Sequence, residues 1–126
     1  MNCNVVLIGG NISNDIDLKY MPNGSAVTQF SLAINRKYNT KDGERKEEVS
    51  FIKVVCYGKL AENVKEYCGK GSGVFVEGRL KQERWDASDG SKRDRTVVIG
   101  ENIQFINTKR KTDTPEDSDE DMDDGL

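Results

Sequence analysis

Five short runs of β-branched and aliphatic residues, separated by polar turns, restrict the fold of this chain more than any other feature. The segments between them hold turn-forming residues such as Pro22, the Asn23-Gly24 pair and the Asp42-Gly43 pair. Short apolar runs bounded in this way predict β-strands. The predicted strands are residues 4–10, 26–34, 49–57, 74–82 and 96–106.

Residues 59–68, between the third and fourth predicted strands, have a different periodicity. Leu60 and Val64, followed by Tyr67 or Cys68, fall on one face of a helix, and Gly69 is placed to end it. We therefore predict an all-β fold, a five-stranded Greek-key barrel of the oligonucleotide/oligosaccharide-binding (OB) type with one short helix. The polar segment 35–48 is expected to be a long hairpin connection.

Charge divides the chain into two parts. The net charge is −3, but residues 112–126 hold eight of the 22 acidic residues and no basic one. The remaining 14 acidic and 19 basic residues give residues 1–111 a charge of +5. We predict a folded domain over residues 1–106 and a disordered acidic tail over residues 107–126, since the tail has too few apolar residues to offset the entropy of folding. A tail that is merely solvated, without a partner, is the alternative.

The composition excludes several classes of function. There is no histidine, and the three cysteines, Cys3, Cys56 and Cys68, do not have the spacing of metal ligands or of a disulfide framework. We therefore expect no metal, no cofactor and no enzyme activity. No run of about 20 apolar residues could cross a membrane, and the N-terminus does not resemble a secretory signal. The expected location is the cytoplasm.

The third predicted strand has two faces of different composition. Alternation places Ile52, Val54 and Cys56 on one face, which suits the barrel interior. The other face is more polar and more aromatic. Its members are Phe51, Lys53, Val55 and Tyr57. Two aromatic rings around a lysine suit a surface that stacks bases and attracts phosphates, although an ordinary outer patch or a subunit interface remains an alternative.

Two further aromatic residues lie in, or at the base of, predicted polar loops rich in lysine and arginine. These are Tyr38, close to Arg36, and Trp85, which precedes Lys92, Arg93 and Arg95. Aromatic rings interleaved with cations are typical of surfaces that bind single-stranded nucleic acid. We therefore predict base stacking on Tyr38, Phe51, Tyr57 and Trp85. The predicted phosphate contacts are Arg36, Lys37, Lys53, Lys59, Arg79, Lys81 and Arg84.

Four sequence motifs resemble those of a known family, the bacterial and phage single-stranded DNA-binding proteins. The motifs are Tyr20-Met21-Pro22-Asn23-Gly24, the segment 54–62 (VVCYGKLAE), the segment 67–72 (YCGKGS) and the segment 76–80 (VEGRL). The resemblance covers residues 4–106. It implies an OB domain that assembles as a homotetramer and binds single-stranded DNA in replication, recombination and repair. It also implies the same four stacking positions.

The resemblance extends to the acidic C-terminus only in part. Family members usually end in an acidic run closed by a Pro-Phe pair, which docks replication and repair proteins. Here the run contains Asp121, Asp123 and Asp124 and closes with Leu126, without proline or an aromatic residue. We treat these four residues as candidates for partner binding and expect a bacterial or phage origin.

Other functions remain open from the sequence. The chain could be an adaptor or DNA mimic whose acidic tail binds a basic partner while the barrel only oligomerises. An RNA-binding or primosomal OB protein is a closer alternative, and an enzyme is a distant one.

Overall fold

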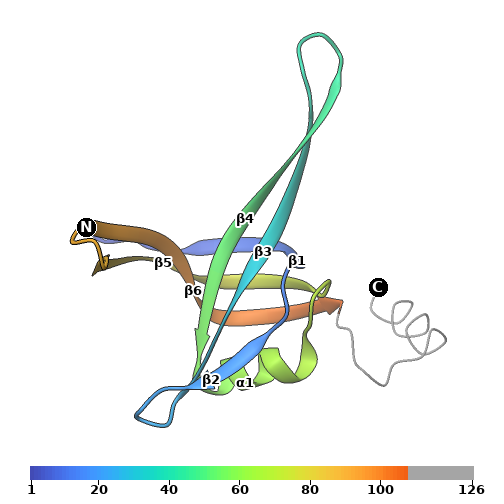
Figure 1. Ribbon diagram of the computed structural model, residues 1–126. Coiled ribbons are helices and arrows are strands. Elements are labelled where there is room, and N and C mark those ends of the chain that lie inside the picture. The colour runs from blue at the N-terminus through green and yellow to red at the C-terminus, as the bar shows by residue number, and fades with distance from the viewer. Residues whose placement is uncertain (108–126) are drawn as a thin grey trace, which may run out of the picture.

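The computed structural model describes residues 1–107, and the expected acidic tail lies outside these residues except for Asn107. The elements are six strands and one helix (Figure 1). The strands are β1 (Val6–Ile12), β2 (Asp17–Tyr20), β3 (Ala26–Asn39), β4 (Arg45–Tyr57), β5 (Gly73–Asp86) and β6 (Lys92–Asn107). The helix α1 (Gly58–Tyr67) connects β4 to β5.

Five of the strands form a closed barrel. The sheet order is β1-β5-β6-β4-β3-β2, and β1 also pairs with β3 at Asn11 and Ile12, which joins the two ends. All pairings are antiparallel except that of β4 with β6. The prediction of an all-β, five-stranded barrel with one helix is therefore confirmed. The short strand β2, which continues the sheet beyond β3, was not predicted.

The barrel interior is apolar, and α1 packs against one end of it. Phe30, Leu32, Val54 and Val76 are fully buried in the main core, together with Val64 of α1. Because the two faces of β4 differ as predicted, Val54 and its neighbours on the inner face enter this core. Among the residues that the structure describes, no helix is long and apolar enough to span a bilayer.

Strand β1 extends further than predicted. The predicted strand covered residues 4–10, whereas β1 begins at Val6 and continues past both glycines to Ile12. The reason is a close approach of two strands, since a β-carbon on Gly10 would overlap the carbonyl oxygen of Ala33 in β3. Glycine is therefore needed here for strand contact and not for a turn.

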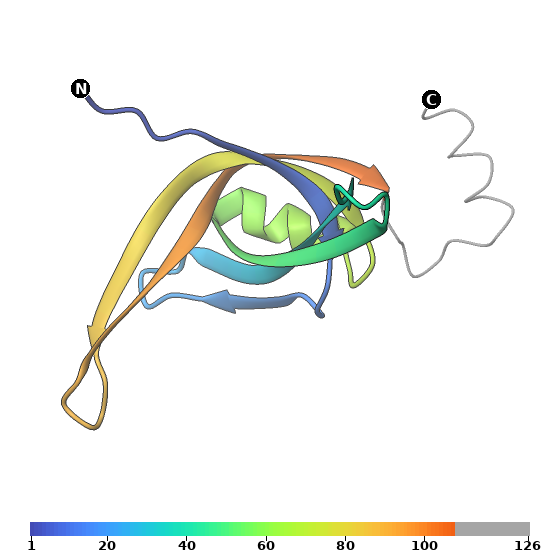
Figure 2. The same ribbon diagram turned by 90° about the horizontal axis from the view of Figure 1, so that it is seen from above.

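Two long hairpins extend beyond the barrel, and we call them the β3–β4 arm and the β5–β6 arm. The first rises from the barrel in Figure 1, and the second projects to the lower left in Figure 2. The prediction of a loop over residues 35–48 is wrong, because β3 and β4 remain paired as far as Asn39 and Arg45. The pairing was not predicted because a ribbon that is solvated on both faces needs no alternation of apolar and polar residues.

Candidate nucleic-acid interface

The outer face of β4 is the centre of the candidate interface. Phe51, Lys53, Val55 and Tyr57 alternate with the core residues of the same strand, as the sequence predicted. The Phe51 side chain is 65% exposed. Lys53, which lies between Phe51 and Tyr57 along the strand, is half-buried. The face therefore presents an exposed ring and an ammonium group on a strand held rigidly by the barrel.

Val55 differs from its neighbours on this face because it is buried. It forms a small apolar cluster with Val97 and Ile99 of β6, and Val27 of β3 packs against the cluster. Val55 and Ile99 are direct partners in the parallel β4–β6 pairing. The outer face of β4 is therefore continuous with one face of the β5–β6 arm, and the cluster joins the two.

Trp85 lies on this continuous face. It lies in β5 one residue before the strand ends, at the base of the connecting turn, because β5 continues to Asp86 and not only to residue 82 as predicted. Its direct partner across the arm is Arg93, and its strand neighbour Glu83 pairs with Arg95 on the same face. Phe51, Tyr57 and Trp85 thus belong to one face that runs from β4 to the tip of the β5–β6 arm.

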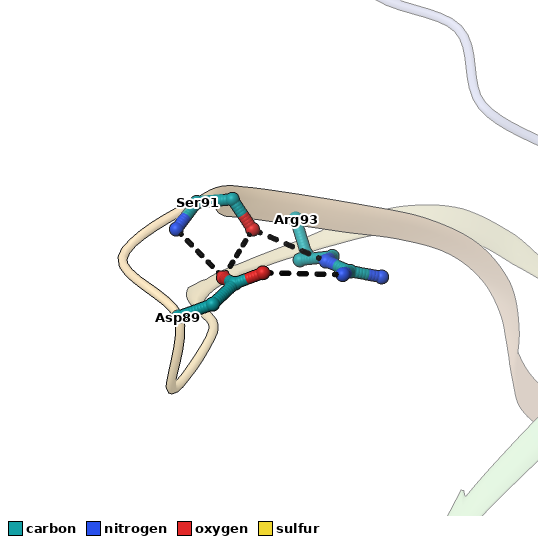
Figure 3. Close-up of polar contacts among 3 residues, drawn as sticks. All are labelled: Asp89, Ser91 and Arg93. Atoms are coloured by element: carbon teal, nitrogen blue, oxygen red, sulfur yellow. Dashed lines mark hydrogen bonds and ion pairs between the residues drawn. The ribbon is translucent and has the colours of Figure 1, made fainter.

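The tip of the β5–β6 arm is ordered by Asp89 (Figure 3). The Asp89 carboxylate accepts hydrogen bonds from the Ser91 backbone N–H at 2.9 Å and from the Ser91 hydroxyl at 2.7 Å. These bonds hold the pKa of Asp89 below its ordinary value. Arg93 donates to the Ser91 hydroxyl oxygen at 3.4 Å and lies 3.8 Å from the second Asp89 oxygen. The guanidinium opposite Trp85 is therefore restrained by the turn.

Tyr38 lies on the other face of the β3–β4 arm. Its partner is Lys46, whereas Phe51 pairs with Ala33, and the two positions differ by an odd number of residues along β4. The Arg36 guanidinium lies 4.8 Å from the centre of the Tyr38 ring and 3.1 Å from Glu48. The structure thus exposes all four predicted rings, by between 36% and 65%, but places only three on one face.

The predicted phosphate contacts are distributed over several surfaces. Lys37 and Lys81 are exposed on the same faces as Phe51 and Trp85 respectively. Arg84 lies on the opposite face of the β5–β6 arm from Trp85 and donates to Gln82 at 2.8 Å. The other candidates outside β4 are engaged by carboxylates.

Three ion pairs involve those engaged candidates. Arg36 pairs with Glu48, Arg79 pairs with Glu101 at 3.3 Å, and Lys59 in the first turn of α1 lies 4.0 Å from Glu62. All of these side chains are substantially exposed, so the pairs are weak and can exchange for a phosphate.

A pocket of about 300 Å³ opens beside Tyr57, where β2, β3 and β4 meet the β5–β6 arm. Its lining includes Lys19, Gln29, Lys53 and Arg95. Lys19, Gln29 and Arg95 were not selected from the sequence as contacts, because β2 was not predicted and the register of β5 with β6 was unknown. Lysine or arginine at alternate positions of a strand is the only signal that could have indicated Lys19 or Arg95.

The two buried cysteines provide no nucleophile to this surface. Burial raises the pKa of Cys56 to about 12, with a further contribution from Cys68, and burial raises the pKa of Cys68 to about 11. Within residues 1–107, no three acidic or cysteine residues are grouped in a way that could hold a metal ion. The surface itself presents exposed rings, cations and hydrogen-bonding groups.

The sequence model of the Single-strand binding protein family matches residues 3–106. Single-stranded DNA-binding proteins from two bacteria illustrate the similarity. The Helicobacter hepaticus protein is 41% identical over 110 residues, which are 87% of this chain and 65% of the relative. The Aquifex aeolicus protein is 38% identical over 119 residues, which are 94% and 80% of the two chains.

The match covers only part of the relatives' length, and a solved structure shares the fold. This chain spans about 65% of the length of the first Helicobacter and Wolinella relatives that it matches. A solved structure, the Plasmodium falciparum SSB complex with ssDNA, superposes with a TM-score of 0.75 at 24% identity, over 83% of this chain and 96% of that chain. At this identity the superposition establishes a common fold.

Proposed function

The chain belongs to the single-strand binding protein family, and from this we propose that it binds single-stranded DNA with little sequence preference. Bases would stack on Phe51, Tyr57 and Trp85 along one face and on Tyr38 on the other face of the β3–β4 arm. Phosphates would be bound by the neighbouring lysines and arginines. The protein would thereby protect single strands during replication, recombination and repair, and it would catalyse no reaction.

One observation carries the proposal, namely the exposure of Phe51 beside Lys53 on a strand whose other face is the barrel core. A phenylalanine in this position contributes nothing to the core of the chain. A base stacked on such a ring gains about 1–3 kcal/mol, and the gain hardly depends on which base it is. Duplex DNA hides the faces of its bases, so the same surface discriminates in favour of single strands.

Fluorescence titration tests the proposal directly, since the chain contains a single tryptophan and the signal belongs to Trp85. Oligo-dT is expected to quench it, and a duplex of the same length is expected to leave it nearly unchanged. Absence of quenching together with absence of a gel shift at low salt would contradict the proposal. Competition between DNA and RNA of equal length distinguishes it from an RNA-binding function.

We further propose that the protein assembles as a homotetramer through a surface remote from the β4 face. Residues 6–10 of β1 pair only with β5, which leaves the other edge of this segment open. The outer face of β1 and β5 also exposes Leu7 and Phe75. Edge pairing of β1 and packing of this apolar face would supply the two interfaces that a tetramer requires. Light scattering of the protein alone measures the mass, and a monomeric mass would contradict the proposal.

The acidic C-terminus has a proposed role in regulation. Asp121, Asp123, Asp124 and Leu126 lie outside the described residues, and the proposal rests on charge alone. A tethered segment of charge −8 competes with DNA for a body of charge +5. Deleting residues 112–126 is expected to tighten DNA binding at low salt, and unchanged affinity there would exclude competition. Docking of replication or repair proteins by this segment, in the cytoplasm of a bacterium or phage host, is part of the same proposal.

A further inference from the structure

The lining of the pocket beside Tyr57 contains an ion pair, that of Glu83 with Arg95. Val27 and Val55 of the apolar cluster contribute to this lining, and Tyr57 lines the pocket at the end of β4. Lys53 enters from β4, while Glu83 and Arg95 enter from the β5–β6 arm. Apolar side chains, a ring and cations are what one nucleotide of a single strand requires.

The pair of Glu83 with Arg95 is the closest ion pair in the part of the chain that the structure describes. The two residues are direct partners in the β5–β6 register, and the Arg95 Nε lies 2.7 Å from a Glu83 carboxylate oxygen. Glu83 is also the most buried acidic side chain among these pairs, with 25% of its surface exposed. Partial burial reduces solvent screening, so this pair persists more than the exposed ones.

Lys53 provides a contrast in the same pocket. Among residues 1–107 it forms no ion pair, so its ammonium group is available to a phosphate. Arg95 presents a planar fork of donors that matches a carboxylate and a phosphate equally well. Glu83 therefore occupies the position, relative to Arg95, in which a DNA phosphate would bind.

We propose that Glu83 limits the affinity of this pocket for single-stranded DNA by competing with a phosphate for Arg95. Arg95 is then a latent DNA contact, and Glu83 is a residue that sets affinity without touching a base. The inference rests on the proposed function and adds a negative determinant to it. The remaining acidic residues of the pocket, Asp15 and Asp17, lie across it on the β2 side and pair with no cation among the described residues.

The test compares E83Q with the unchanged protein by fluorescence anisotropy of a labelled oligo-dT, over salt concentrations from about 0.05 M to 1 M. Each additional phosphate contact steepens the dependence of log K on log salt by about 0.7. E83Q is therefore expected to bind about eightfold more tightly at about 0.05 M, with the difference vanishing near 1 M. The double variant E83Q/R95Q should return to the original slope.

Glu66 supplies the matched control, since it is exposed on α1 and does not line the pocket. E66Q removes the same charge, so equal effects of E66Q and E83Q would reduce the inference to net charge and overturn it. Unchanged or weaker binding by E83Q would overturn it as well, as would a steep slope that persists in the double variant. Failure of the unchanged protein to bind oligo-dT would instead contradict the proposed function. Melting temperatures show that each variant is folded.

Discussion

Truncation of Phe51 to alanine gives the sharpest test of how the outer face of β4 works. The ring is 65% exposed and stands on the face of the strand that points away from the core. Its removal therefore leaves no cavity in the core, and the melting temperature should change little. What is lost is a flat apolar surface on which a base can lie.

The expected loss of DNA affinity follows from the energy of stacking one base on an exposed ring. A stacked base is worth about 1–3 kcal/mol, and each 1.4 kcal/mol corresponds to a factor of ten, so F51A is expected to weaken binding about 5- to 140-fold. Because stacking involves no ionic contact, the slope of log K against log salt should remain unchanged. A loss of affinity at constant slope is thus the signature of a stacking residue.

Val49 offers a control on the same face of the same strand. It precedes Phe51 by two residues and is 45% exposed, so V49A removes apolar surface without removing a ring. Anisotropy of labelled oligo-dT should show little change for V49A, a large loss for F51A, and recovery for F51W. If F51A binds within twofold of the unchanged protein, or if V49A loses as much as F51A, stacking at this position is refuted.

Four other predictions concern charge, packing and the thiols. K53Q should lower the slope of log K against log salt by about 0.7. Its loss of affinity relative to the unchanged protein should then be about fivefold greater at about 0.1 M salt than at about 1 M. An unchanged slope would show that Lys53 contacts no phosphate. G78A should lower the unfolding free energy by about 1–3 kcal/mol, since its β-carbon would overlap a carbonyl oxygen of β6, and an unaltered melting temperature would contradict this. Of the cysteines, exposed Cys3 alone should react with a thiol reagent in the native protein at pH 8. Folding raises the pKa of Cys56 from 9.0 to about 12 and that of Cys68 from 9.0 to about 11. The contribution of these two protonated thiols to the stability of the folded protein is therefore complete below pH 9 and is lost as pH rises toward 12. Melting temperatures measured over an alkaline pH series detect the loss.

Several elements of the barrel could be predicted because burial leaves a pattern in the sequence. The alternation along residues 49–57 separated Val54 from Phe51 correctly, since one face of β4 lies in the core and the other does not. The helix between the third and fourth predicted strands was recognisable because Leu60, Val64 and Cys68 recur at helical spacing, and all three pack into or against the core. Gly69 follows the end of the helix as predicted, but the chain leaves the helix one residue earlier, at Cys68, in an extended conformation.

The arms show where this reasoning fails. Residues 35–39 and 45–48 are paired strands, yet they were predicted as a loop because both faces of the ribbon are solvated. Four residues of β2 were missed for a related reason, as a strand so short shows too little alternation to be recognised. The hairpin register, which places Tyr38 and Phe51 on opposite faces, could not be predicted either.

The sequence by itself determined which side chains are rings and cations, which face of β4 is buried, and how charge is divided between the body and the C-terminus, because these depend on residue type and local periodicity. Only the tertiary structure decided that Val55 and Ile99 join β4 to the β5–β6 arm, that Tyr38 stands apart from the other rings, and that Glu83 holds Arg95. Those contacts depend on the register between strands distant in the chain. Hydrogen bonding and close approach in three dimensions set that register, and residue spacing along the chain does not encode it.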